Sequence, residues 1–335
     1  CAESQLTQAT ASHWPDLPFD QICGSSSSCP TVVSPAFFTR KRLTSITTRV
    51  WNGTDYDEVD SWALTHLFPM SGDGTSPSLW LDSIQHTGKV GGTTLSLPKV
   101  SFVGQQYPNR VDGLDQAPPL YKWRIIAINS EAGATTSVNY LATECTPTNK
   151  PAAPDANTMR CMPVHWTPPG LTQPSLHYFH KYPVESVVED DLTGSSSDLV
   201  TTYSYVGSPA WHYDDSELTQ DKYRSWNDWR GYGTVKVNEG LATETRSQSQ
   251  FLYLRGMDGD KLAAGGTKDV WVTDSQGGTI EDLPRYPAHH AAIIGDPRND
   301  ENLVIAGLHA AFLLFHNAAV DLVRREKQAE VREKA

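Results

Sequence analysis

Two histidines are spaced so that a single helix could present them to a metal. His309 and His316 are seven residues apart within the apolar run Leu303–Val323. If that run is helical, the separation is about 10.5 Å along one face, at about 1.5 Å per residue. One histidine can then coordinate a metal ion that the other cannot reach. The alternative is that both are ordinary histidines on an apolar helix.

Four of the five cysteines flank two short loops. Cys23 and Cys29 enclose a Gly-Ser loop, and Cys145 and Cys161 enclose a loop rich in Pro, Asn and Ala. This arrangement predicts two local disulfides formed in an oxidising compartment, and small buried thiols are the alternative. Zinc binding is not indicated, because the chain has no Cys-x-x-Cys and no paired Cys/His spacing. Cys1 has no predicted partner.

Other polar clusters are weaker candidates for metal ligands. His177 and His180 have no third ligand at a suitable spacing, so we interpret them as surface or turn histidines. The run 258–260 and two further acidic clusters offer oxygens to Ca²⁺, but none fits an EF-hand, and solvated turns are the simpler interpretation. No phosphate-binding loop, dinucleotide fingerprint or nucleophile elbow occurs.

Composition and charge argue against several classes of partner. The 335 residues carry a net charge of −12, whereas nucleic-acid binding requires clustered Lys and Arg. No apolar run reaches ~18 residues without polar interruption, so no membrane span is expected. The chain has 24 Gly and 22 Pro, and it is rich in Ser, Thr, Tyr and Trp. This composition is typical of a protein made mostly of loops and strands.

Strand-like segments occupy the chain from Lys41 onward. Apolar or alternating runs predict strands at Leu43–Trp51, Ser61–Phe68, Trp80–His86, Thr94–Val103 and Trp123–Ile128. The dipeptide Asn52-Gly53 predicts a tight hairpin turn after the first of them.

A strand, a turn with an acidic residue and a glycine, and a returning strand occur twice and begin a third time. The three copies cover residues 125–140, 184–205 and 270–278, and the third breaks off after its turn. We expect the acidic side chains to accept backbone N–H bonds in the turns and the glycines to adopt positive φ. Repeated hairpins predict a stacked β architecture, with tyrosines and tryptophans packed between repeats.

A series of short motifs runs through the same region. They are Leu43–Thr48, Val59–Trp62, Leu64–His66, Pro108–Asp112, His165–Gly170, Tyr178–Tyr182, Tyr205–Tyr213, Trp229–Gly233 and Tyr253–Asp260. On these motifs, about residues 40–280 resemble the N-terminal portion of large secreted Rhs/YD-repeat proteins of actinobacteria. The resemblance implies a β shell that often encloses a toxin, and a scaffold role without catalysis. The self-cleaving core segment of that family is not recognisable in this chain.

The C-terminal part has a different pattern. Asp296-Pro297 fits a helix start, and Leu303–Val323 predicts a buried helix of about twenty residues. Residues 294–302 with Leu308-His309 and 315–317 resemble the proximal-histidine helix of animal-type haem peroxidases, over about residues 283–323. The resemblance implies His309 as the axial haem ligand and His316 as a histidine that does not bind iron. The distal His and Arg that peroxide cleavage requires are not recognisable.

Together these patterns predict a mainly β fold of antiparallel hairpin repeats with one long C-terminal α-helix. We divide the chain into an irregular segment (1–40), an Rhs-like β-rich domain (41–280) and a helical haem-peroxidase-like fragment (281–335).

The predicted function is that of a secreted or cell-surface structural or interaction module, part of a toxin-associated β shell. We expect no catalytic residues and no cofactor, and we expect other shell segments or a protein cargo as partners. The alternative is a haem-binding protein with peroxidase activity in the response to oxidative stress. A fusion, a truncated gene or a composite sequence would also produce the abrupt change after Gly278. An uncovered Leu303–Val323 helix would then promote self-association.

Overall fold

A computed structural model describes residues 5–14, 17–19, 22, 38–168, 170–192, 194, 197–273 and 278–281. Most of the strands in these residues form one antiparallel sheet of eleven strands. Its members are β1 (Ser45–Trp51), β2 (Tyr56–Leu67), β3 (Trp80–Gly88), β4 (Leu95–Ser96), β5 (Val100–Tyr107), β6 (Lys122–Asn129), β7 (Ala134–Tyr140), β10 (Val184–Asp191), β11 (Leu199–Val206), β14 (Thr234–Glu239) and β15 (Ser247–Leu252).

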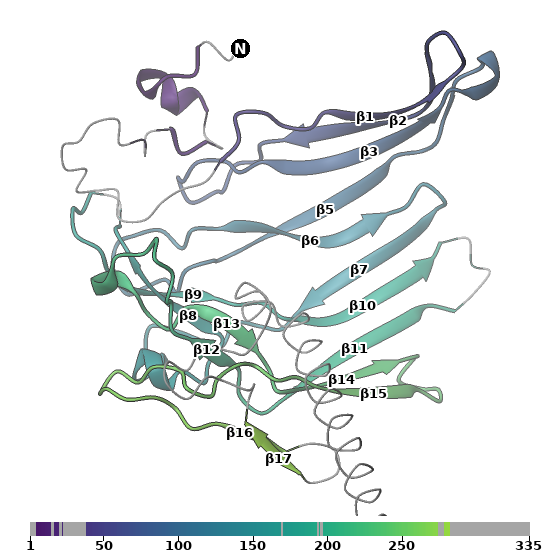
Figure 1. The fold of residues 1–335 in the computed structure, drawn as a ribbon. Helices are drawn as coiled ribbons and strands as arrows, with labels where there is room; N and C mark the ends of the chain where they lie inside the picture. The colour runs from purple at the N-terminus through teal and green to yellow at the C-terminus, as the bar shows by residue number, and fades with distance from the viewer. Residues whose placement is uncertain are drawn as a thin grey trace, which may run out of the picture.

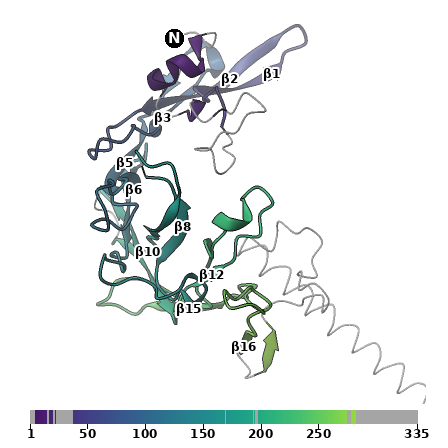
Figure 2. The same cartoon turned by 90° about the vertical axis from the view of Figure 1, so that its left-hand side faces the viewer.

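The strands of this sheet follow one another in space nearly as they do in sequence. The order is β1-β2-β3-β5-β6-β7-β10-β11-β14-β15, with β4 paired to β3 (Figure 1). Viewed edge-on, the sheet curves from β1 to β15 (Figure 2). Within the described residues, β1 and β15 each pair on one side only, so the sheet is open.

Three two-stranded sheets accompany the large one. They pair β8 (Cys161–Trp166) with β9 (Ser175–His180), β12 (Ala210–His212) with β13 (Asp228–Gly231), and β16 (Trp271–Thr273) with β17 (Thr279–Glu281). In Figure 2, β8 and β12 lie on the concave side of the large sheet. The β8–β9 and β12–β13 hairpins therefore form a second, partial layer over one face of the sheet.

The predicted hairpin at Asn52-Gly53 is confirmed. Strand β1 pairs with β2 from Trp51↔Tyr56 onward. The Asn52 side-chain oxygen accepts bonds from the backbone N–H groups of Thr54 and Asp55, both at 2.9 Å, and Gly53 has φ of 101°. This side-chain bonding and the positive φ are what an Asn-Gly turn supplies without steric cost.

The first two hairpin repeats are also confirmed, although one of the proposed turn bonds is wrong. Strand β6 pairs with β7, and β10 pairs with β11. In the β6–β7 turn, Gly133 has φ of 90°, as predicted. However, Ser130 and not Glu131 accepts the turn N–H, because its hydroxyl oxygen lies 3.0 Å from the nitrogen of Ala134.

The third repeat was predicted to lack its returning strand, and this is wrong. Strand β17 returns antiparallel to β16, with Trp271 opposite Glu281 and Thr273 opposite Thr279. The pair forms a separate two-stranded sheet instead of extending the large one. The sequence suggested a break because β17 has only three residues, too few to produce a visible alternation.

Aromatic side chains pack across the large sheet, but no ring pair among the described residues joins one of the predicted hairpin repeats to another. The rings of Trp80 (β3) and Trp123 (β6) lie 6.2 Å apart, on either side of Gly104 in β5. Tyr205 of β11 packs against Tyr232, with ring centroids 4.8 Å apart. These aromatic contacts join strands that are far apart in sequence.

One cluster of buried hydrophobic residues lies at the β8–β9 hairpin and not at the centre of the large sheet. Its residues are Val111, Cys145, Cys161 and Tyr178, with Leu114 and Met159 packed against them. The predicted disulfide between Cys145 and Cys161 is present within this core. Tyr182 connects the region to the large sheet, since its ring lies 5.2 Å from that of Tyr107 and 4.5 Å from the Arg124 guanidinium.

Two predictions lie outside the described residues. They are the Cys23–Cys29 disulfide and the long helix over Leu303–Val323. Among the described helices, all of them short 3-10 turns such as Gln8–His13, none has the length and apolar character needed to cross a bilayer.

Candidate functional site

A fully buried arginine organises the loop between β5 and β6. Arg110 has a relative exposure of 0%. One terminal nitrogen donates to the carbonyl oxygens of Ala117 at 2.9 Å and Pro118 at 3.3 Å. The other donates to Oδ1 of Asp115. Because a buried guanidinium must have its donors satisfied, these bonds hold residues 110–118 as one unit.

Arg110 also bonds across to the β8–β9 hairpin. Its Nε–H donates to Nδ1 of His177 at 3.2 Å, and its guanidinium carbon lies 5.4 Å from the centre of the Trp166 ring. The His177 ring meets Trp166 edge-to-face at 5.2 Å. A cation beside an aromatic face is stabilised by the ring quadrupole. The loop and the hairpin are thus joined by one side chain.

Ser175, His177 and Asp115 are arranged like a Ser-His-Asp triad. Ser175 Oγ lies 2.9 Å from His177 Nε2, and Asp115 Oδ2 lies 3.7 Å from His177 Nδ1. In a working triad, Nδ1 carries the proton and Nε2 accepts one from the serine. Here Nδ1 accepts from Arg110, so the proton of the neutral ring is on Nε2 and is donated to Ser175. This geometry does not activate the serine.

The protonation states of this cluster follow from its surroundings. Burial lowers the pKa of His177, and the neighbouring Arg110 charge lowers it further against the opposing effect of Asp115. For Asp115, burial raises the pKa, but the Ala117 N–H and the Arg110 guanidinium outweigh it and hold the pKa below its usual value. At neutral pH the cluster therefore contains a neutral imidazole and an ionised carboxylate.

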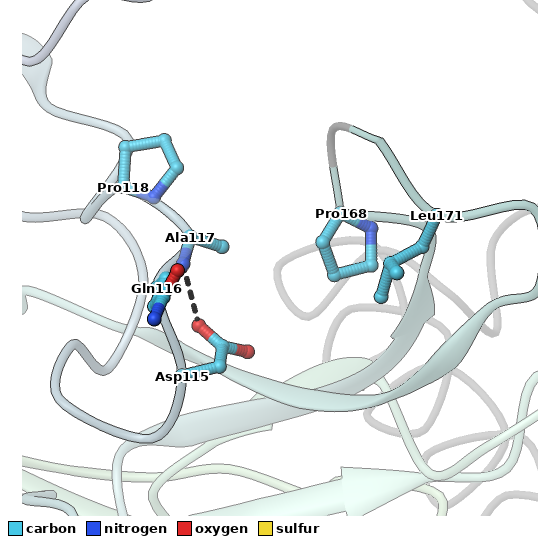
Figure 3. Close-up of a pocket in the computed structure, with 6 residues that line it drawn as sticks. All are labelled: Asp115, Gln116, Ala117, Pro118, Pro168 and Leu171. Carbon is cyan, nitrogen blue, oxygen red and sulfur yellow. Dashed lines mark hydrogen bonds between the residues drawn. The ribbon is translucent and has the colours of Figure 1, made fainter.

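A pocket of about 410 Å³ opens beside this cluster. One wall is the loop segment Asp115–Pro118, and the other is formed by Pro168 and Leu171 from the β8–β9 turn (Figure 3). Figure 3 shows the Asp115 carboxylate on the side of the first wall, with one oxygen bonded to the Ala117 nitrogen. The arrangement offers one anionic acceptor in a pocket whose other lining residues are Gln116 and four apolar residues.

The loop carries a strained backbone next to the pocket. Leu120 has φ of 54°, the one non-glycine residue with positive φ among those described. An L-residue with a side chain of this size adopts that conformation at a cost, and it persists only where the surroundings hold it. The nearby backbone bonds from Asn109 and Arg110 to the Pro119 carbonyl, 3.1 and 2.8 Å, provide that restraint.

The sequence interpretation of His177 and His180 was wrong. Both lie in β9 and are buried, at 4% and 9% exposure, and are not surface or turn residues. Residues three apart in a strand point to opposite faces, so the two do not converge on a metal. Both ring nitrogens of His177 are already engaged, by Arg110 and Ser175.

The acidic pair Asp258 and Asp260 was interpreted as a solvated turn, and for Asp260 this is also wrong. Its side chain is fully buried, with Oδ2 2.7 Å from Lys268 Nζ and Oδ1 accepting from the Tyr213 nitrogen at 3.0 Å. Asp258 accepts from the Val270 nitrogen. Within the described part of the chain, no group of three or more His, Cys, Asp or Glu is placed to hold a metal ion.

His309, the predicted haem ligand, lies outside the described residues, so haem binding stays a prediction from sequence. Of the residues that the structure brings together, Arg110 lies in the quoted motif 108–112 and His177 directly precedes the motif 178–182, whereas Asp115, Leu171 and Ser175 lie outside the motifs, within three residues of one of them. Arg110 and His177 are 67 residues apart, and no spacing rule connects them. The clearest local signal of a buried charge was the position of Arg110 directly before the apolar Val111.

Comparison with known proteins identifies no relative. No protein-family model matches the chain, and no curated protein and no solved structure matches it either.

Proposed function

We propose that this chain is a structural and interaction module, a segment of a secreted or cell-surface β shell of the Rhs/YD-repeat kind, without catalytic residues of its own. The observation that carries the proposal is the open, curved sheet, whose strands run in sequence order from β1 to β15. A sheet built by adding hairpins one after another can be extended at either edge. Other shell segments are then the natural partners, and a protein cargo would lie along the curved surface.

The edge strands support this function through what they leave exposed. Every residue of β1 and of β15 is exposed. On β1 these include Val50 and Trp51, at 59% and 56%, and on β15 they include Phe251 and Leu252. Exposed apolar edges with unpaired backbone groups favour pairing with another strand.

The bonding pattern identifies which backbone groups are available on β1. The Leu64 nitrogen donates to the Thr44 oxygen, and Ile46 pairs with Trp62 two residues further along. In an antiparallel ladder the residues between such pairs direct N–H and C=O away from the partner strand. Ser45 and Thr47 therefore present their backbone groups at the outer edge.

The disulfide is consistent with an extracellular location. Cys145 and Cys161 are bonded within a core that has few large apolar side chains. Disulfides persist in oxidising compartments and are common where a small core must be reinforced.

The proposal is tested by blocking the outer edge of β1. Thr47→Pro removes an outward N–H and leaves the bonds to β2 intact, whereas Thr47→Ala keeps that N–H and serves as the matched control. We expect the wild-type chain and Thr47→Ala to associate with rising concentration in sedimentation velocity, and Thr47→Pro to associate markedly less. Monomeric wild-type protein at all concentrations, or equal association of the three proteins, would contradict edge pairing as the basis of assembly.

A further inference from the structure

The pocket between the Asp115–Pro118 segment and the β8–β9 turn contains a carboxylate oxygen that is only partly used. Oδ1 of Asp115 accepts from both Arg110 and the Ala117 nitrogen. No described residue donates a hydrogen bond to Oδ2. Nδ1 of His177 lies 3.7 Å from Oδ2, but this nitrogen is itself the acceptor of the bond from Arg110.

An ionised oxygen of this kind requires a donor that the described residues do not supply. The Asp115 carboxylate is ionised because its pKa lies below the usual value, and its side chain is 35% exposed. Arg110 bonds Asp115 through Oδ1 alone, and its Nε and other terminal nitrogen are directed at His177 and at the carbonyls of Ala117 and Pro118. The donor must therefore be water or a ligand group.

The pocket walls indicate what accompanies that donor. Ala117 and Pro118 on one side and Pro168 and Leu171 on the other are apolar lining residues, and Gln116 adds one neutral polar side chain to the first wall (Figure 3). A lining with four apolar residues, one neutral amide and one anionic carboxylate fits an aliphatic stem that ends in a cation. The net charge of −12 also favours the approach of a cationic group.

The number of free oxygens discriminates between the two common cationic side chains. A guanidinium binds a carboxylate best through two parallel bonds, and Arg110 already occupies Oδ1. An ammonium is a point donor and needs only one oxygen. We infer that this pocket binds the ammonium group of a lysine side chain presented by a protein partner, with Oδ2 of Asp115 as the acceptor.

The site is held in place before any ligand arrives. The bonds from Arg110 fix Asp115 on the loop, and the pair of bonds to the Pro119 carbonyl restrains the same loop beside the strained Leu120. A rigid acceptor loses less freedom on binding than a mobile one. This lysine site goes beyond the shell proposal and uses residues that the edge of β1 does not touch.

The experiment measures binding of Nα-acetyl-lysine N-methylamide by isothermal titration calorimetry or by NMR shifts. The norleucine analogue, which has the stem without the ammonium, and the arginine analogue are the comparison probes. We expect the lysine probe to bind at least about tenfold more tightly than the norleucine probe, as a charge-assisted bond provides. Equal binding of the lysine and norleucine probes, or tighter binding of the arginine probe, would overturn the inference.

Two variants locate the site. Asp115→Asn keeps an oxygen for Arg110 and replaces the pocket acceptor with a donor, so the lysine probe should bind about tenfold more weakly. Leu171→Trp fills the pocket without touching the Arg110 bonds, and Leu218→Trp is its control because Leu171 and Leu218 are equally exposed, at 57% and 56%. Leu171→Trp should abolish binding and Leu218→Trp should not. Unchanged binding of the lysine probe by Leu171→Trp would refute the site even if Asp115→Asn does not fold. The binding results of both variants are independent of edge pairing by β1.

Discussion

The Nε–H of Arg110 donates to Nδ1 of His177 over 3.2 Å, and this bond determines which imidazole nitrogen carries the proton. The same guanidinium bonds Asp115 and two backbone carbonyls of its own loop. Ser175, His177 and Asp115 are arranged like a catalytic triad, but the bond from Arg110 makes His177 a donor toward Ser175 instead of a base. The bond also brings together two segments that form opposite walls of the pocket.

Replacing Arg110 should destabilise the fold strongly. Arg110→Met removes the charge but keeps much of the volume, and it leaves Asp115, His177 and two carbonyls without their donor. We expect the free energy of unfolding to fall by about 3 kcal/mol. This is the lower end of the range for removing one partner of a buried ion pair, because Asp115 is partly exposed. Urea denaturation measures it. Arg49→Met, which breaks the exposed pair with Glu58, is the control and should change stability little.

A methyl group at Gly104 should not be tolerated. A Cβ there would lie 2.8 Å from the Trp80 ring and 3.1 Å from the Trp123 ring. Gly104→Ala should therefore cost about 1–3 kcal/mol through overpacking. At Gly88, in the neighbouring β3, the nearest atoms to an added Cβ are 3.8 and 4.0 Å away, so Gly88→Ala is the matched control. Equal melting temperatures of the two variants would mean that β5 is not packed between the two tryptophans.

The stability of the protein should fall as the pH drops below about 6.5. Burial, reinforced by a nearby arginine, lowers the pKa of both His177 and His180. The unfolded chain then binds protons at a higher pH than the folded chain does, so acidification favours unfolding. His177→Gln should flatten this dependence below about pH 6.5 in urea titrations. An identical pH profile in the variant would exclude His177 as a contributor.

Loss of the Cys145–Cys161 bond should be costly. The two cysteines are 16 residues apart, and they lie in the core beside Val111 and Tyr178. Replacing both with alanine should remove about 3 kcal/mol of stability by the loop-closure relation. Thermal unfolding with and without reductant measures this loss. Intact mass after alkylation under non-reducing conditions also tests the Cys23–Cys29 prediction, because a second disulfide would leave only Cys1 to be alkylated.

The haem alternative is tested by spectroscopy. If His309 is an axial ligand, protein reconstituted with haem should show a Soret band that His309→Ala abolishes. His316→Ala should retain the band, because a histidine seven residues away on the same helix face is about 10.5 Å distant. A band lost equally in both variants would contradict His309 as the specific ligand, and no band in the wild type would remove the haem alternative.

Much of the strand content could be predicted because it is a local property. Asn52-Gly53 determines a turn through its own backbone preferences, and the alternation in residues 125–140 and 184–205 determines two hairpins. The short β17 was missed because three residues contain too little pattern. The Glu131 bond was predicted wrongly because Ser130 is better placed for the same N–H.

The candidate site could not be predicted, because its members come from separate parts of the chain. His177 and His180 were interpreted as surface or turn residues, because no local sequence pattern shows that β9 packs against the loop that follows β5. Asp260 was interpreted as a solvated turn residue, because its ion-pair partner Lys268 lies beside it only in the folded chain. Burial depends on which segments are packed together, and that is a property of the whole fold.

The sequence by itself therefore determined the mainly β character, the antiparallel hairpins and the Cys145–Cys161 pairing, because each depends on residues that are neighbours or near neighbours in the chain. Only the tertiary structure decided that the strands form one curved sheet, open within the described residues, that Arg110 joins a loop to a distant hairpin, and that an Asp115 oxygen without a described donor lies at a pocket. The physical reason is that the low exposure and the exact distances at Arg110, Asp115 and His177 arise from long-range packing, which no local preference specifies.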